Sequence, residues 1–225
     1  MCGRFSLTKA EQTINDRFQT SGGAIPYIPR FNGAPGQNQV VITNQEPGKL
    51  SSFRWGLIPF WANDPAIGNK LINAKSETAH QKPSFREAFK KRRCLVISDG
   101  FFEWKKWGKD KVPHYIMLPG HQLFAMAGLW ETWKNDEGEP IHTFTILTTE
   151  PNETMQSIHH RMPVILPEKE EMLWLESDDP KELQSIMKPY PQKMDLYPVS
   201  RLVNSPRNDV AEIIRPAEGY SGSLF

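Results

Sequence analysis

Short runs of apolar residues, many alternating with polar ones, predict a chain built mainly from β-strands. We expect strands at residues 4–7, 40–43, 50–57, 94–97, 101–107, 114–118, 123–129, 144–149, 163–166 and 194–197. Within 101–107 the alternation places Phe102 and Trp104 on one face and Glu103 on the other. Glu103 shares its face with Phe101, and a carboxylate beside an aromatic ring is unusual without a partner.

Helical signals are fewer and shorter. Thr8 and Glu11 have the spacing of a capping box, which predicts a helix through about Phe18. Further helices are expected at residues 83–93, 151–158, 167–175 and 180–187. The basic run at 90–93 would complement the negative end of a helix dipole, an interpretation that we prefer to a localisation signal.

Proline and glycine separate these elements. Residues 25–37 mix three prolines with glycine and alanine, which predicts a loop. Gly56 and Pro59 break the aromatic segment 55–61, so its rings should lie on a loop or at a strand end. Neither an internal repeat nor a linker divides the chain, which we interpret as one α+β domain over residues 1–225, rich in antiparallel strands.

Composition narrows the class of protein. The chain has 225 residues, of which 38% are hydrophobic and 24% charged, as expected of a globular domain. It lacks a leader and an apolar run of the roughly 20 residues that span a bilayer, so neither secretion nor membrane insertion is expected. Two cysteines are too few for a disulfide framework and fit a reducing, cytoplasmic location. We expect no metal and no cofactor, because neither ligand spacings nor phosphate-binding glycine motifs occur.

The N-terminus offers a distinctive nucleophile. A small second residue allows Met1 to be trimmed, which would give Cys2 a free α-amine beside its thiol. The reference pKa values of these groups are about 8 and 8.5, so both are partly available near neutral pH. An aldehyde could condense with the amine to an imine, and the sulfur could then close a thiazolidine ring. The alternative is a small buried residue entering a strand, which position alone favours.

Two groups of residues could carry chemistry. Cys2, Asn73, Glu103 and His159 would form a nucleophile arrangement if they met in space. Arg4, Lys75 and Arg161 could hold phosphates, while Phe60, Trp61 and Trp104 could stack on bases. The alternatives are structural: a loop histidine at His159 or His160, a turn-forming Asn73, a Glu103–lysine pair, and an aromatic core with surface arginines.

Seven ordered motifs resemble those of the SRAP family, the SOS response-associated peptidase-like proteins that covalently trap abasic sites in single-stranded DNA. They are residues 1–5, 34–35, 55–59, 73–78, 93–95 with 99–104, 159–163, and 198–200 with 203–204. The resemblance runs from Cys2 to about Asn204, leaving a C-terminal tail at about 215–225. It implies a single SRAP-type domain of mostly antiparallel sheets that form a barrel-like core with flanking helices.

The resemblance also implies roles. Cys2, after loss of Met1 by autoproteolysis, would crosslink to the ring-opened abasic site as a thiazolidine and shield the lesion. Asn73, Glu103 and His159 would position groups and move protons. The DNA contacts would be Arg4, Pro35, Phe60, Trp61, Lys75, Trp104 and Arg161. Two positions depart from the family pattern. Many members have arginine where this chain has Lys75, which keeps the charge but lacks the bidentate fork of a guanidinium. Some members have tryptophan where this chain has Phe60, which keeps a stacking face of smaller area.

Three activities remain open beside the crosslink: a cysteine-type peptidase or hydrolase, a lyase that resolves the imine by β-elimination, and a non-catalytic binding module. The aromatic and basic residues favour a DNA partner, which a self-processing peptidase does not need. We expect a monomer that binds single-stranded DNA, or a junction of single and double strands, and that joins the nucleoid when it binds damaged DNA.

Overall fold

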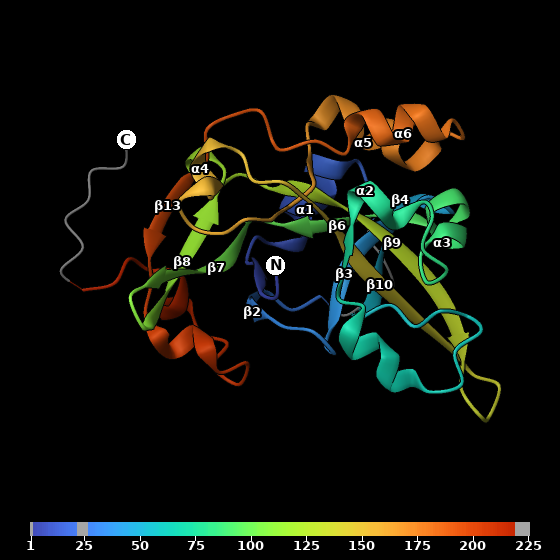
Figure 1. Ribbon diagram of the computed structural model, residues 1–225, viewed down its shortest axis with the longest axis horizontal. Helices are drawn as coiled ribbons and strands as arrows, with labels where there is room; N and C mark the ends of the chain where they lie inside the picture. The colour runs from blue at the N-terminus through green and yellow to red at the C-terminus, as the bar shows by residue number, and fades with distance from the viewer. Residues whose placement is uncertain (1, 22–26, 219–225) are drawn as a thin grey trace.

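The computed structural model describes residues 2–21 and 27–218, which form two β-sheets with short helices around them (Figure 1). The larger sheet closes on itself, because its strands pair in the ring β10–β4–β3–β6–β9–β10. Its strands are β3 (Asn38–Thr43), β4 (Glu46–Trp55), β6 (Arg93–Ser98), β9 (Phe124–Lys134) and β10 (Pro140–Thr149). All pairings in the ring are antiparallel except β10 with β4. The predicted α+β class and its barrel-like core are therefore confirmed.

Short strands extend the ring at both sides of its long β9–β10 hairpin. They are β5 (Asn73–Lys75), β11 (Met162–Pro163) and β12 (Ile165–Leu166). The second sheet has the order β13-β8-β7-β1-β2. Its strands are β13 (Asp195–Pro198), β8 (Asp110–Met117), β7 (Gly100–Trp107), β1 (Phe5–Leu7) and β2 (Arg30–Gly33).

The helices are α1 (Glu11–Phe18), α2 (Ser76–Ala79), α3 (Arg86–Lys91), α4 (Glu153–Gln156), α5 (Glu168–Glu176) and α6 (Pro180–Ile186). Short 3-10 segments are η1 (Pro65–Lys70), η2 (Pro119–His121), η3 (Arg201–Asn204) and η4 (Ala211–Ile214). Among the described residues, none of these helices is long and apolar enough to cross a membrane.

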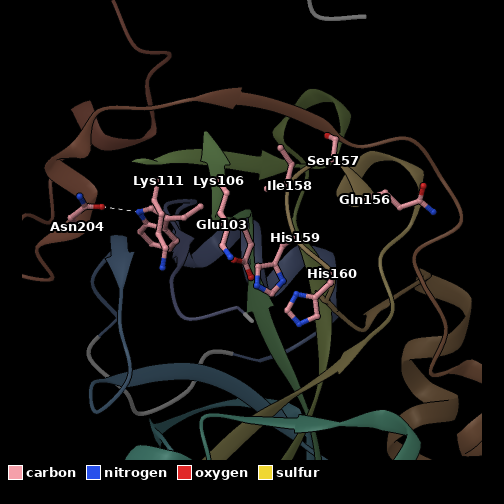
Figure 2. Close-up of a pocket in the computed structure, with 10 residues that line it drawn as sticks. Glu103, Lys106, Lys111, Gln156, Ser157, Ile158, His159, His160 and Asn204 are labelled. Carbon is pink, nitrogen blue, oxygen red and sulfur yellow. Dashed lines mark hydrogen bonds between the residues drawn. The ribbon is translucent and has the colours of Figure 1, made fainter. Parts of the chain in front are cut away.

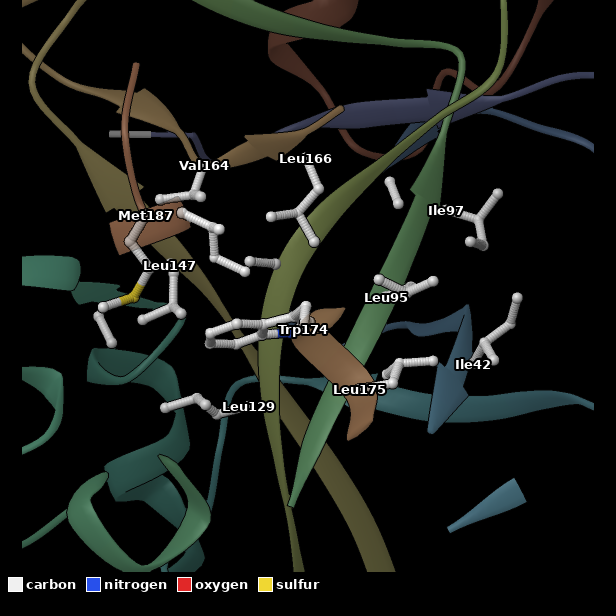
Figure 3. Close-up of a cluster of buried hydrophobic side chains, with 14 of the residues drawn as sticks. Ile42, Leu95, Ile97, Leu129, Leu147, Val164, Leu166, Trp174, Leu175 and Met187 are labelled. Carbon is white, nitrogen blue, oxygen red and sulfur yellow. The ribbon is translucent and has the colours of Figure 1, made fainter. Parts of the chain in front are cut away.

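Alternate residues of β6 divide the core into two parts. Leu95 and Ile97 face a cluster that α5 covers with the fully buried Trp174, shown in Figure 3. Cys94 and Val96 face the other cluster, which includes Phe5 of β1 and Phe101 of β7. Burying a large apolar side chain contributes about 1.5–3 kcal/mol, so the second cluster fastens the N-terminal strand to the barrel.

A polar network at Asp99 fixes the same strand. Ser6 Oγ donates to Asp99 Oδ1 at 2.6 Å, and the Thr8 backbone N–H donates to Asp99 Oδ2 at 2.7 Å. Phe5 pairs with Phe101 across β1 and β7, and the Phe102 N–H donates to the Arg4 carbonyl at 2.9 Å. The residues before β1 are therefore held along β7, toward Glu103.

The structure corrects several sequence predictions near the N-terminus. The capping box is wrong: Thr8 Oγ1 donates to Asp99 Oδ2 at 2.6 Å, and Ala10 precedes α1 without a side-chain cap. The loop predicted at 25–37 contains β2, whose Phe31 and Asn32 N–H groups both donate to Asp209 Oδ1. Residues 25 and 26, at the start of that loop, lie outside the described residues.

Two later elements also differ from the prediction. The helix predicted at 83–93 ends at Lys91, because Arg93 turns inward as the first residue of β6. The single strand predicted at 163–166 is two, since β11 pairs with β10 while β12 pairs with β9. The helices predicted at 167–175 and 180–187 are confirmed as α5 and α6, each to within two residues.

Candidate active site beside the N-terminal strand

Cys2 lies at the centre of the predicted constellation and is fully buried. Asn73 Nδ2, from β5, donates to the Cys2 carbonyl oxygen at 2.7 Å. Asn73 Oδ1 is buried and has no hydrogen-bond partner among the described residues. Asn73 therefore anchors the N-terminal segment with its amide nitrogen and keeps an acceptor for a further donor.

Burial makes the Cys2 thiol a weak acid. Burial first, and the negative charge of Glu103 second, raise the pKa of Cys2 to about 12. The thiol therefore stays protonated at neutral pH, in contrast to a thiolate nucleophile of lowered pKa. Burial also raises the pKa of Cys94, whose side chain lies in the core.

Glu103 lies on β7, opposite His114 of β8, and only 3% of its surface is exposed. Burial raises the pKa of its carboxyl group, because a charged carboxylate is disfavoured away from water. A raised pKa brings the group closer to the working pH, where a carboxyl can both accept and donate a proton. Its charge acts on the Cys2 thiol, which is consistent with the backbone pairing that holds the N-terminal segment along β7.

His159 lies between α4 and β11, and its Nδ1 contacts the backbone of Arg161. Nδ1 accepts the Arg161 backbone N–H at 3.0 Å, which is shorter than its 3.3 Å distance to the Arg161 carbonyl oxygen and favours the tautomer with the proton on Nε2. Burial lowers the pKa of His159 to about 4, so the ring is neutral at pH 7. It stacks on His160 with 4.3 Å between the ring centroids. His159 thus presents a neutral N–H donor rather than a cation.

An open cavity of about 940 Å³ joins Glu103 and His159. Figure 2 shows it between the β7–β8 hairpin and the segment that carries His159 and His160. Trp104 also lines it, and its Nε1–H donates to Asn204 Oδ1 at 2.8 Å. Lys106 and Lys111 complete the basic side of the same cavity. The Cys2 side chain is not part of the lining and lies buried next to Glu103.

The predicted DNA contacts are only partly gathered here. Phe60 and Trp61 are 57% and 48% exposed and line a separate cavity with Trp133 and Lys134 of β9. Pro35 is half-buried in the turn that follows β2. These three residues lie outside the lining of the cavity that holds Glu103 and His159.

The three predicted phosphate ligands differ in their partners. Lys75 is exposed at the end of β5. Arg161 is engaged by Glu77 in a bidentate ion pair at 2.6 and 2.9 Å, and this pairing lowers the pKa of Glu77. Arg4 donates to Asn32 Oδ1 at 3.1 Å, so that its guanidinium is oriented by a fully buried amide.

The sequence analysis missed three partner residues. Asn32 orients Arg4, Glu77 pairs with Arg161, and Asn204 fixes the ring of Trp104. Asn204 and Glu77 lie inside motifs that were singled out, but their pairing joins segments about a hundred residues apart and has no local signal. Within residues 2–21 and 27–218, no group of three or more histidine, cysteine or carboxylate side chains could hold a metal ion.

Comparisons with known proteins show the family of the chain and related proteins of similar sequence and fold. The model of the family described as SOS response associated peptidase (SRAP) matches residues 1–206. The abasic site processing protein YoqW of Bacillus subtilis is 47% identical over 224 residues, which cover 95% of this chain and 99% of that protein. HMCES of Xenopus tropicalis, also named an abasic site processing protein, is 30% identical over 258 residues, covering 94% and 77%. A crystal structure from Bacteroides thetaiotaomicron superposes with a TM-score of 0.88 at 32% identity and covers 96% of this chain and 100% of its own.

Proposed function

The chain belongs to the SOS response associated peptidase (SRAP) family, and from that premise we propose that it processes abasic sites in DNA by bonding to them covalently through Cys2. The observation that carries the proposal is the anchoring of the Cys2 backbone by Asn73 at 2.7 Å, beside the buried Glu103. The names of the relatives support abasic-site processing as the wider activity.

The proposed reaction begins after Met1 has been removed, which leaves the α-amine on Cys2. The abasic sugar opens when its C1′–O4′ bond breaks and its C1′ hydroxyl becomes the aldehyde. The hydroxyl proton passes to O4′ through water, and the neutral His159 ring stabilises the departing oxygen by a hydrogen bond from Nε2–H. The Cys2 amine then attacks the C1′ aldehyde, and Glu103 moves the protons that allow the hydroxyl to leave as water. The sulfur finally adds to the imine carbon, its proton passes to the nitrogen, and a thiazolidine ring results.

A neutral thiol suits this order of events. The raised pKa of Cys2 keeps the sulfur protonated while the amine forms the imine, and the thiol proton is then needed on the ring nitrogen. Proximity supplies much of the rate, because amine, thiol and Glu103 are held together before DNA arrives. Asn73 would keep the Cys2 backbone in place throughout.

We assign the binding of DNA to residues around and beyond the cavity. Trp104 would stack on a base, while Arg4 and Lys75 would hold phosphates. Arg161 would do the same after exchanging Glu77 for a phosphate. Pro35, Phe60 and Trp61 would contact the strand further from the lesion. The preferred partner in this proposal is single-stranded DNA, or a single-strand junction, bound by a monomer.

The test is an intact-mass measurement on purified protein, alone and after incubation with a single-stranded oligonucleotide that carries one abasic site. We expect the free protein to lack Met1 and the mixture to gain a denaturation-stable adduct of protein plus oligonucleotide minus one water. Trimmed protein without an adduct would contradict the proposal. A cleaved strand with only a borohydride-trapped imine would assign the lyase reaction instead.

The same measurement examines how Met1 is lost. We propose that Glu103 accepts the Cys2 thiol proton as the sulfur attacks the Met1 carbonyl carbon. The Met1–Cys2 amide bond then breaks, with the proton passing to the Cys2 nitrogen, and water hydrolyses the resulting thioester to release Met1. Glu103→Ala and Cys2→Ala should then both retain Met1. If an aminopeptidase removes it, Glu103→Ala will have lost Met1 as the unmodified protein does.

Asn204 should act on DNA binding through Trp104. Asn204→Leu removes the 2.8 Å hydrogen bond to Trp104 Nε1 and frees the ring to rotate. We expect single-stranded DNA to bind about five- to tenfold more weakly, the effect of one hydrogen bond of about 1 kcal/mol. The rate of adduct formation at saturating DNA should not change.

The control for Asn204 is a double-mutant cycle with Trp104→Phe, which keeps a ring but lacks the Nε1–H donor. If Asn204 acts through that donor, Asn204→Leu should have no further effect in the Trp104→Phe background. Additive losses would show that Asn204 acts in some other way.

A further inference from the structure

Two lysines face each other on the β7–β8 hairpin. The register of the hairpin pairs Lys106 with Lys111, and both side chains are exposed. Like charges directly opposite on neighbouring strands destabilise a sheet. In the part of the chain that the structure describes, no carboxylate lies within ion-pair distance of either lysine. An external anion would relieve this repulsion.

The lysine pair lies at the cavity of the candidate active site. Lys106 and Lys111 line the same cavity as Glu103 and His159 (Figure 2). The charge of Lys106 reaches across that cavity, where it adds to the effect of burial in lowering the pKa of His159. An anion bound between the lysines would therefore lie in the cavity that Glu103 and His159 also line, on the side of Trp104.

The tip of the β7–β8 hairpin is also basic and exposed. Lys105 and Lys109 add two positive charges, and Trp107 near the tip is 72% exposed. Near the tip the acidic residue is Asp110, and it lies 3.7 Å from Arg201. The whole chain carries a net charge of only +1, so this basic arm is a local concentration.

We propose that Lys106 and Lys111 form a clamp for one backbone phosphate of the DNA strand next to the abasic nucleotide. The inference rests on the proposed function and names a contact that the motifs do not include. Lysine ammonium groups suit this role because each presents three donors as a compact charge to the non-bridging oxygens. One phosphate between them would neutralise the cross-strand repulsion, so that binding and hairpin stability would support each other.

The test compares Lys106→Gln/Lys111→Gln with the unmodified protein in binding a short single-stranded oligonucleotide with one tetrahydrofuran abasic analogue. The analogue has no aldehyde, so binding is measured without crosslinking. We expect an affinity loss of about five- to tenfold that does not depend on base sequence. The slope of log affinity against log salt should fall by about 0.7–1, the contribution of one phosphate contact.

The matched control is Lys169→Gln/Lys181→Gln, which removes the same charge from exposed positions on α5 and α6. These helices lie at the upper right in Figure 1, whereas β7 and β8 lie to the left. Its salt slope should equal that of the unmodified protein. The clamp variant should melt at or above the unmodified temperature, because the like-charge pair is gone. A lower melting temperature together with an unchanged slope would overturn the clamp.

Neutral methylphosphonate linkages, introduced one at a time, locate the phosphate. One position should weaken binding by the unmodified protein to the level of the clamp variant, and should leave the variant itself unaffected. If no position behaves in this way, the lysines supply a diffuse field and the clamp is overturned. Suppose that the unmodified protein crosslinks abasic DNA but the clamp variant has the same salt slope as the unmodified protein. This result overturns the clamp and leaves the proposed function standing. Absence of the crosslink overturns the proposed function alone.

Discussion

Cys2→Ala is expected to abolish the denaturation-stable adduct with abasic DNA while leaving DNA binding intact. Because self-cleavage would leave Met1 on Cys2→Ala, the variant is first treated with a methionine aminopeptidase, which accepts a small second residue such as alanine and frees the α-amine. The imine can therefore form, but without sulfur no ring can close. We expect the stable adduct to fall by at least roughly 100-fold, the lower end of what a positioned reacting group contributes. The measurement is the adduct yield on a denaturing gel, with and without borohydride.

Cys94→Ala is the matched control, since it removes the second buried cysteine from the core without touching the site. Its adduct yield should equal that of the unmodified protein. Trimmed Cys2→Ala should give an adduct only with borohydride. A heat-stable adduct from Cys2→Ala in the absence of borohydride would mean that another nucleophile does the chemistry.

The fold was predictable where local pattern and tertiary environment agree. The alternation in 101–107 placed Phe102 and Trp104 on one face, and both belong to a cluster apart from Phe101. Helices α5 and α6 begin at proline-led segments and were predicted within two residues. In these elements the side chains that favour the local structure are also those that the core buries.

The incorrect predictions at Thr8 and at residues 30–33 have a common cause. In both, a group forms hydrogen bonds with a residue that is distant in the sequence. Thr8 has the spacing of a helix cap, but buried Asp99 takes its hydroxyl and its N–H. Residues 30–33 have the composition of a loop, yet Asp209 binds two of their N–H groups and fixes an extended edge. Such long-range partners override local preference and leave no trace in the neighbouring sequence.

The same reasoning applies to the candidate site. The motifs predicted that Cys2, Asn73, Glu103 and His159 would meet, and the structure brings Cys2 to Asn73 and Glu103, with His159 across the cavity from Glu103. The Glu77 partner of Arg161 could not be predicted, because it depends on how β5 and β11 flank β10. The opposition of Lys106 and Lys111 did have a local signal. Gly108 adopts φ +61° in the two-residue turn between β7 and β8, which sets the register.

The second large effect is expected on the stability of the fold when Arg93 is replaced. The sequence analysis placed Arg93 at the basic end of a helix, but the structure makes it the first residue of β6 and buries it to 1% exposure between two helix ends. Its guanidinium donates five hydrogen bonds to backbone carbonyls at 2.7–3.2 Å. These belong to Phe89 and Lys90 at the end of α3, and to Trp174, Leu175 and Ser177 at the end of α5. The last carbonyls of a helix lack partners within it, and Arg93 supplies donors for both helices at once.

Arg93→Met preserves most of the side-chain volume but leaves five carbonyls without their donors. We expect the free energy of unfolding to fall by about 3–5 kcal/mol, the usual cost of removing one side of a buried charged contact. For a chain of this size the melting temperature should fall by about 6–20 °C. The stability of Arg93→Lys should lie between that of Arg93→Met and that of the unmodified protein, because one ammonium group cannot reach both helix ends.

Arg86→Met is the control for Arg93. Arg86 belongs to α3 as well, but its side chain is 55% exposed and its nearest acidic atom is 3.9 Å away. Its loss should change the free energy of unfolding by less than about 0.5 kcal/mol. Chemical denaturation of the three variants measures the free energies of unfolding, and thermal denaturation measures the melting temperatures. An Arg93→Met protein within about 1 kcal/mol of the unmodified one would mean that water replaces the guanidinium at the two helix ends.

Since α5 covers the barrel face opposite the site, a loss of stability at Arg93 should leave the rate of adduct formation unchanged below the melting transition.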